Sequence, residues 1–325
     1  ELDCPEENIL VQTFSHLLNI LQVFCLYSVI YHLPKVSLFR SQYGPRMEIG
    51  NIMRSIFFSV HGNHLASQSL KQQMHNHKNT IAAHDLLLWG SSSDVAAGKL
   101  KLAAFYLAQG KLDTMEEVLN QVDANFTHIV YEQGDTFLQH STLSKILHED
   151  LSTAQFIQNY LALMVCHSPS DIHSIPKVLI FEIFRSTGSE LGVYMITSLT
   201  LNIAVVKARV YLYFLQYQCF HLQGRVAHSL VALNNMIWVF VDYYHKLLDM
   251  IEIMTVNFSR HHFHIEMPKY LDHVTTSLNL MAYCLKQDGR LMDGFKVLCL
   301  SMKLRNQHNA AKWQIATFIS SSMRF

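Results

Sequence analysis

The most distinct pattern in the chain is an amphipathic, helix-like stretch that ends in glycine, followed by a basic residue and then an aliphatic one. It occurs three times, at Gly110, Gly224 and Gly289. Glycine adopts the left-handed backbone conformation that closes a helix at little steric cost. Each copy therefore predicts a helix, a tight turn, and a second helix that folds back against the first.

Apolar residues recur at helical spacing after each turn. The predicted second helices span residues 112–122, 226–240 and 291–304. Their core-facing positions are expected to include Met115, Val118, Leu119 and Val122 in the first, and Leu230, Leu233, Met236 and Ile237 in the second. Two antiparallel helices cannot bury both of their apolar faces alone, so these hairpins should stack on neighbours.

The gaps between the three glycines come close to three and two lengths of a tetratricopeptide repeat, which is about 34 residues long. Degenerate hairpins are expected to fill these gaps, with breaks at Ser168-Pro169 and at 186–188. The predicted fold class is all-α, a tetratricopeptide-like solenoid of helical hairpins. An irregular helical bundle stays open as the alternative, because any helical hairpin can turn at glycine.

The chain before the first clear hairpin predicts a helical region over residues 1–90, the end of a preceding domain. It contains an apolar helix over 1–40 closed by Pro34, and a helix-compatible stretch over 46–60. The sequence His61-Gly62-Asn63 is expected to break the pattern. Residues 64–80 are polar and predict either a solvated helix or a loop.

A short polar cluster, Ser91 to Asp94, is typical of a helix N-terminus. A short side-chain oxygen there can accept a backbone amide of the first helical turn. We therefore place the start of the tetratricopeptide-like domain at residue 91 and its end at residue 325.

Composition narrows the function classes. Half of the residues are hydrophobic and 15% are charged, which is too apolar for a disordered chain. Lys+Arg and Asp+Glu balance at 25 each, so no overall field favours nucleic acid or an anionic membrane. Only 12 Gly and 6 Pro occur, which suits long helices and argues against an all-β fold.

The cysteine pattern predicts a cytoplasmic location. Six cysteines stand far apart without a CxxC pair, and four of them have apolar neighbours, where cysteine behaves as a small hydrophobe. Two glycosylation sequons, at Asn125 and Asn257, would suit secretion, but such short patterns also arise by chance. No basic segment precedes an apolar run as in a signal peptide. The start at Glu1 suggests a segment of a longer protein.

Two apolar runs raise the alternative of a polytopic membrane protein. They cover residues 17–33 and 191–206. A spanning helix needs about 20 apolar residues, and both runs are shorter and interrupted by polar side chains. We interpret them as buried core helices, so no membrane partner is expected.

Three stretches together resemble a known family. They are residues 91–119, the string Leu138-Gln139-His140-Ser141-Thr142-Leu143, and Asn309-Ala310-Ala311-Lys312-Trp313. The chain resembles the C-terminal helical tail of invertebrate Mab-type nucleotidyltransferase-like proteins, which are relatives of the DNA sensor cyclic GMP-AMP synthase. The similarity covers roughly residues 85–319. It implies a tetratricopeptide-like tail beyond the enzymatic domain of an innate immune sensor.

The catalytic part of that family needs a Gly-Ser turn after a strand and acidic residues that hold two metal ions. Gly90-Ser91-Ser92 lacks both the preceding strand and the following acidic pair, and Glu48 and Asp85 are isolated. No catalytic residue, metal or cofactor is therefore assigned. A cryptic nucleotidyltransferase fragment remains the alternative, and it requires a mixed sheet with two carboxylates close together in residues 1–90.

Other candidate chemistry is weak. His262 and His264 could share one metal ion only on extended backbone, and zinc needs a third protein ligand. Cys166 and His167 are adjacent, and on a helix they would point about 100° apart. Ser168, Asp171 and His173 match a catalytic triad in composition only, since a triad is defined by geometry. The chain contains no dinucleotide-binding, Walker, zinc-protease or serine-hydrolase motif.

The sequence therefore favours a non-catalytic scaffold for protein–protein interaction. In tetratricopeptide scaffolds, the first helices of successive hairpins line a concave groove that binds a protein or peptide. By that analogy the partner-binding residues are predicted to be Lys99, Tyr106, Tyr213, Gln216, Asn279 and Lys286. Tyr213, Tyr217 and Phe220 share one helical face and are expected first of all to pack in the core.

Overall fold

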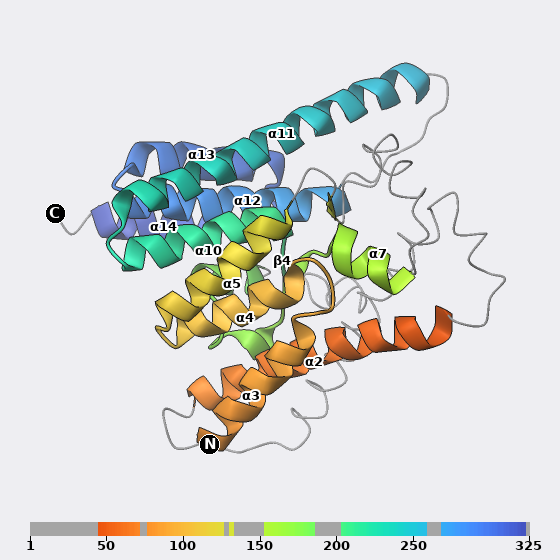
Figure 1. Ribbon diagram of the computed structural model, residues 1–325. Coiled ribbons are helices and arrows are strands. Elements are labelled where there is room, and N and C mark those ends of the chain that lie inside the picture. The colour runs from red at the N-terminus through yellow and green to blue at the C-terminus, as the bar shows by residue number, and fades with distance from the viewer. Residues whose placement is uncertain are drawn as a thin grey trace, which may run out of the picture. The chain divides into compact units, whose positions relative to one another are not determined.

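The computed structural model describes residues 45–71, 77–126, 130–132, 153–185, 203–258 and 268–322 (Figure 1). Helices account for 76% of the described residues and strands for few of them. The described part of the chain is therefore mostly helical, as the sequence predicted. It divides into two compact units, Glu1–Pro176 and Lys177–Phe325.

The described part of the first unit is built around four helices. Its elements are α2 (Pro45–Lys71), α3 (His77–Gly90), α4 (Ala97–Ala108), α5 (Leu112–Asn125), β1 (Tyr131–Glu132), α7 (Thr153–Tyr160), β2 (Leu161–Ala162), β3 (Val165–His167) and the 3-10 helix η2 (Pro169–Asp171). β1 and β2 pair in parallel, with Tyr131 opposite Leu161. The boundary predicted at residue 90 falls inside this unit, at the end of α3.

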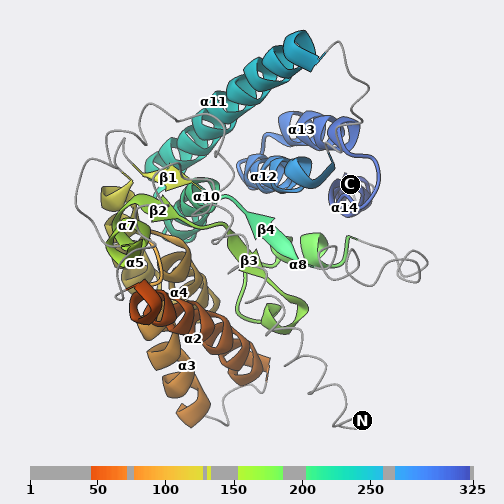
Figure 2. The same cartoon turned by 90° about the vertical axis from the view of Figure 1, so that its right-hand side faces the viewer.

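The described part of the second unit has five longer helices and the short helix α8. Its described elements are α8 (Val178–Ile183), β4 (Ala204–Val206), α10 (Ala208–Leu222), α11 (Val226–Phe258), α12 (Pro268–Gln287), α13 (Leu291–Leu304) and α14 (Ala311–Ser322). Figure 2 shows α12, α13 and α14 side by side, and α14 packs on α13.

The three predicted turns are confirmed, because Gly110, Gly224 and Gly289 close the hairpins α4–α5, α10–α11 and α12–α13. Their φ angles are +71°, +73° and +78°. In each, the amide after the glycine donates to a carbonyl in the last helical turn: Lys111 to Tyr106 at 3.0 Å, Arg225 to Phe220 at 2.8 Å, and Arg290 to Leu285 at 2.9 Å. This is the Schellman arrangement, and it satisfies carbonyls that the helix end leaves without a partner.

Within each unit the hairpins pack in the same order. α2 pairs with α3 and α4 with α5, and α4 packs on both helices of the preceding pair. In the second unit, α10 pairs with α11 and α12 with α13, and α12 packs on both α10 and α11. The apolar face of one hairpin is thus covered by the first helix of the next.

The predicted break at His61-Gly62-Asn63 is wrong, because α2 continues through it to Lys71. The reason is a close approach between α2 and α3. A Cβ on Gly62 would lie 2.8 Å from the backbone nitrogen of Leu87. Gly62 therefore serves helix packing, although in the isolated sequence it looks like a helix end.

The cluster 91–94 caps α4 as predicted, and one residue provides most of the cap. The carboxylate of Asp94 accepts the amides of Ala97 at 2.9 Å and Gly98 at 3.2 Å. It also accepts the amide of Leu163 at 2.9 Å. Asp94 therefore joins the start of α4 to a segment almost 70 residues later in the chain.

The described residues of the gaps between the glycines hold no further helical hairpins. Between α5 and α10 they form short strands, η2 and two short helices, α7 and α8. After Gly224, the 33-residue α11 is followed by α12, the first helix of the next hairpin. The predicted break at Ser168-Pro169 is confirmed by η2, whereas 186–188 and the string 138–143 lie outside the described residues.

The core faces of α10 and α11 are rotated from the predicted ones. In α10, Tyr211, Phe214 and Tyr217 are fully buried, whereas Tyr213 and Phe220 are half-buried. In α11, the predicted Leu233 and Met236 are buried, but Leu230 is exposed. In α5, by contrast, Met115, Leu119 and Val122 are buried and Val118 is half-buried, close to the prediction. Apolar side chains occur on more than one side of α10 and of α11, so the periodicity of these two sequences does not identify a single buried face.

None of the described helices is both long enough and apolar enough to cross a membrane. Residues 17–33 lie outside the described part of the chain, as do residues 191–202. Ala204–Val206, at the end of the second apolar run, forms the strand β4 and not a helix.

The hairpin turns can be tested at Gly224. A Cβ there meets nothing within 4 Å, so substitution changes only the backbone preference. We expect Gly224→Ala to lower the free energy of unfolding by about 1 kcal/mol, because alanine resists a positive φ. Gly224→Asn should cost less, since asparagine tolerates this conformation. Urea unfolding measures both, and an alanine variant as stable as the wild type would contradict the assignment.

Candidate functional site

The stretch of α12 from His273 to Leu280 is unusual because it is buried on all sides and rich in polar side chains. His273, Thr276, Ser277 and Asn279 are each at most 4% exposed. A buried polar group is costly unless it finds a hydrogen-bond partner. This stretch therefore depends on polar groups that other segments of the second unit bring to it.

Glu182, from the short helix α8, is the central partner. Its carboxylate accepts hydrogen bonds from the amide of Asn279 at 2.7 Å and the hydroxyl of Thr276 at 3.1 Å. A guanidinium nitrogen of Arg185 lies 3.6 Å from the same carboxylate. Glu182 is only 1% exposed, and this burial raises its pKa, while Arg185 and the hydrogen bonds act to lower it.

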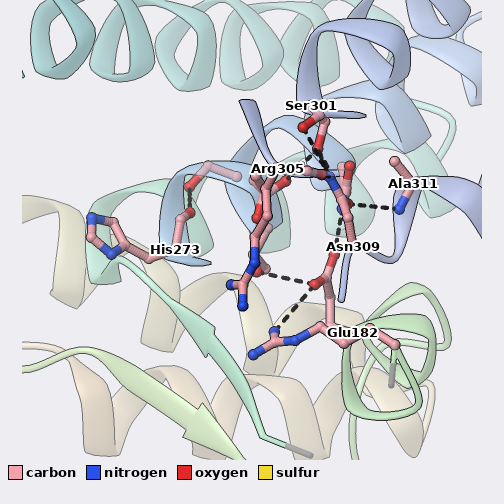
Figure 3. Close-up of polar contacts among 11 residues, drawn as sticks. Glu182, His273, Ser301, Arg305, Asn309 and Ala311 are labelled. Atoms are coloured by element: carbon pink, nitrogen blue, oxygen red, sulfur yellow. Dashed lines mark hydrogen bonds and ion pairs between the residues drawn. The ribbon is translucent and has the colours of Figure 1, made fainter. Parts of the chain in front are cut away.

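Asn309 extends the network to the last two helices. Its Oδ1 accepts a hydrogen bond from Asn279 at 3.1 Å and from the amide of Ala311, at the start of α14, at 2.9 Å. Its Nδ2 donates to the carbonyls of Ser301 and Arg305, both at 2.9 Å. Figure 3 shows Asn309 between Glu182 on one side and Ser301 on the other. One side chain thus ties α12 to the end of α13 and the start of α14.

His273 lies in the same buried stretch of α12. Burial, and secondarily the nearby charge of Lys207, lower its pKa to about 3. The ring is therefore neutral at physiological pH. Its backbone carbonyl accepts a hydrogen bond from the hydroxyl of Ser277 at 2.6 Å.

This arrangement binds a carboxylate, and the carboxylate belongs to the chain itself. Two neutral donors and one cation converge on Glu182, as they would on an acidic side chain of a bound peptide. Among the described residues, no group of three His, Cys, Asp or Glu side chains could hold a metal ion. The network therefore joins segments of the second unit to one another.

Two of the six predicted partner-binding residues belong to the first unit and four to the second. In the second unit, Asn279 and Gln216 are buried and Tyr213 is half-buried. Lys286 lies over the ring of Phe318, at 4.5 Å. The side-chain amide of Asn279 donates hydrogen bonds to Glu182 and Asn309, so it is not available to a partner protein in this structure.

Two of the predicted residues lie in the first unit. Lys99, on α4, is half-buried and its Nζ lies 3.5 Å from the carbonyl oxygen of Val95. Burial lowers its pKa. Tyr106 is buried, and its hydroxyl lies 2.8 Å from Nε2 of His84.

The other candidate residues of the first unit form a structural cluster. Asp171 accepts the amide of Ser168 at 2.9 Å, which makes a capping box for η2. The His173 side chain is exposed, while Asp171 is buried, so these residues do not form a triad. Cys166 and His167 lie on the strand β3 and not on a helix, and neighbouring strand side chains point to opposite faces.

His167 is fully buried beside Asn63 of α2, with its Nδ1 3.4 Å from the Asn63 amide. Burial, with Lys101 nearby, holds the pKa of His167 well below its usual range. His262 and His264 lie outside the described residues.

Sequence reasoning missed Glu182 and Asn309. Glu182 stands alone in the apolar run Val178–Phe184, and a single carboxylate in such a run signals a buried charge with a partner elsewhere. Asn309 was noted only as part of the family resemblance. Nothing in the sequence around it indicates the contact with Asn279, which lies 30 residues away.

Comparisons of the chain with protein-family models, with curated proteins and with solved structures find no match.

A double-mutant cycle tests the buried pair. Glu182→Ala leaves the Arg185 guanidinium buried without its carboxylate, so we expect a loss of about 3–5 kcal/mol in the free energy of unfolding. The additional change Arg185→Ala should then cost less than it does alone, because it removes the orphaned charge. Urea unfolding measures all three variants, with Glu182→Gln as a milder change if the alanine variant does not fold.

The exposed pair Arg290 and Asp293 is the matched control, with the same i,i+3 spacing and a contact of 2.9 Å. Its alanine variants should each change stability by about 1 kcal/mol or less. A similar cost for the buried and the exposed pair would contradict the role given to Glu182.

His273 links the stability of the second unit to pH. Its pKa is about 3 in the folded chain and near 6.5 in an unfolded one. The unfolded chain therefore binds the proton more readily, and stability is lost as pH falls from 6.5 towards 3. Through this residue we expect a loss of about 2 kcal/mol between roughly pH 7 and pH 5. His273→Gln should remove that part of the loss.

Urea unfolding followed by tryptophan fluorescence measures this effect. In a Trp89→Phe background the remaining tryptophans, Trp238 and Trp313, both belong to the second unit. His228→Gln, at an exposed position of α11, is the control and should keep the full pH dependence. An unchanged pH dependence in His273→Gln would show that another group is responsible.

Proposed function

We propose that this chain is a non-catalytic scaffold for protein–protein interaction, built of stacked tetratricopeptide-like hairpins. The packing order supports the proposal. In each unit, the first helix of the second hairpin covers both helices of the first hairpin. Stacked helical repeats bury their apolar faces in the same way.

The observation that carries the proposal is the apolar outer surface of the second helices in the second unit. Trp238 on α11 is 72% exposed and Met292 on α13 is 68% exposed. Val231, two helical turns before Trp238 on α11, is exposed as well. Large apolar side chains grouped on an exposed face typically mark a surface that binds another protein.

The proposed partner surface differs from the one that the sequence predicted. The first helices of the hairpins should line a groove, but α8 and β4 pack on α12, and residues 273–280 of α12 are buried on all sides. Glu182 already occupies the donors of Asn279 and Thr276. We therefore propose that the partner contacts the outer faces of α11 and α13.

We extend the proposal to the family that the sequence resembles. As the helical tail of a Mab-type, cyclic GMP-AMP synthase-like sensor, the chain would bind its partner in the cytoplasm while catalysis takes place in another domain. The nucleotidyltransferase alternative required a mixed sheet within residues 1–90. The described residues 45–71 and 77–90 form the helices α2 and α3.

Affinity capture with surface variants tests the scaffold. We expect the wild-type chain to bind partner proteins from a cytoplasmic extract saturably. Trp238→Glu or Met292→Glu should lose them, because a charge cannot be buried against an apolar partner. Gln121→Glu, at an exposed position on the polar α5, is the control and should retain them. The same proteins bound by all variants, or none bound saturably, would contradict the proposal.

A further inference from the structure

The outer face of α13 combines apolar and basic side chains. Met292, Lys296, Leu300 and Lys303 are exposed, and their spacing places them on one side of the helix. The opposite side packs in the core through Leu298, which is fully buried. One side of α13 therefore packs within its own unit, and the other side is exposed.

Basic side chains outnumber acidic ones on and beside this face. Asp293 is the one acidic residue of α13, and it accepts two hydrogen bonds from Arg290, at 2.9 and 3.1 Å. The Lys296 amine lies 4.0 Å from Asp293, and the Lys296 side chain is 73% exposed. Arg290 thus offsets most of the acidic charge. Lys296 and Lys303 leave the apolar face positive.

The second helices of the other two hairpins, α5 and α11, do not share this combination of exposed apolar and basic side chains. The exposed positions of α5 include Asp113, Glu117, Asn120 and Gln121, the side chains of an ordinary solvated helix. The described part of α11 exposes Val231 and Trp238, but it has no Lys, Arg, Asp or Glu between Val226 and Val241. Between Val226 and Val241, α11 therefore offers no charged side chain to a partner, whereas the outer face of α13 carries two exposed lysines.

We propose that the outer face of α13 binds an amphipathic helix with acidic residues, carried by a partner protein. Apolar side chains of that helix would cover Met292 and Leu300. Its carboxylates would meet Lys296 and Lys303, which are two helical turns, or about 10 Å, apart. The same lysines repel a basic helix with an identical apolar face, so they select the partner. This inference rests on the proposed scaffold function and names the partner chemistry of one of its surfaces.

A pair of designed peptides tests the proposal with the whole chain. The first is a fluorescein-labelled helix of Leu, Ala and Glu, with leucine at i, i+4 and i+8 and glutamate beside the leucines. The second replaces each glutamate by lysine. Fluorescence anisotropy should show saturable binding of the acidic peptide, weakened by added salt, and binding of the basic peptide at least about tenfold weaker.

Variants assign the binding to α13. Lys296→Glu/Lys303→Glu should weaken binding of the acidic peptide about tenfold or more and strengthen binding of the basic one. Met292→Ser/Leu300→Ser should weaken both. Lys111→Glu, at an exposed position outside α13, is the matched charge control and should change neither. Equal binding of the two peptides, or no effect of the lysine changes, would overturn the proposal.

Other occupants give different results. If a second copy of the chain covers α13, sedimentation should show a dimer that Met292→Ser/Leu300→Ser converts to a monomer. If the lysines serve nucleic acid or an anionic membrane, labelled single-stranded DNA or phosphatidylserine vesicles should bind and the acidic peptide should not. Each of these results would overturn the proposal. Failure of the peptide while Trp238→Glu still loses captured proteins would remove this inference and leave the scaffold function standing.

Discussion

The structure depends on one backbone constraint, a helix end that only a residue with positive φ can close. Gly110, Gly224 and Gly289 each satisfy it, and each reverses the chain with the same hydrogen bonds. At one of these turns, Arg225 also lies over the Phe220 ring, at 4.6 Å, and ties the two sides of the turn together. A hairpin made this way has an apolar face that it cannot cover alone, so the stacking in each unit follows from the turns.

The second unit adds a buried polar network to this apolar stacking. Glu182, Asn279 and Asn309 come from α8, α12 and the connection before α14. Loss of any member of such a network leaves buried polar groups without partners and lowers the stability of the fold. The network therefore favours one arrangement of these segments over others. It also accounts for the polar side chains in the buried stretch of α12. The chain provides the carboxylate that a groove of this kind would take from a ligand.

Under the proposed scaffold function, the exposed surfaces of the outer helices are the places where another protein would bind. Trp238 and Met292 are large apolar side chains that are exposed there. The surface of α11 between Val226 and Val241 carries no Lys, Arg, Asp or Glu, whereas the surface of α13 carries Lys296 and Lys303. A scaffold with these two surfaces would discriminate between partners by charge and gain affinity from apolar burial.

Sequence alone determined the features that depend on local geometry. The three glycine turns, the Asp94 cap and the buried face of α5 follow from residues within one or two helical turns of each other, so their pattern predicts them. Tertiary contacts decided the rest. Gly62 looks like a helix end until α3 packs against it, and the buried sides of α10 and α11 cannot be read from helices that are apolar all round. Glu182 and Asn279 lie 97 residues apart, and only the folded chain brings the carboxylate to the amide.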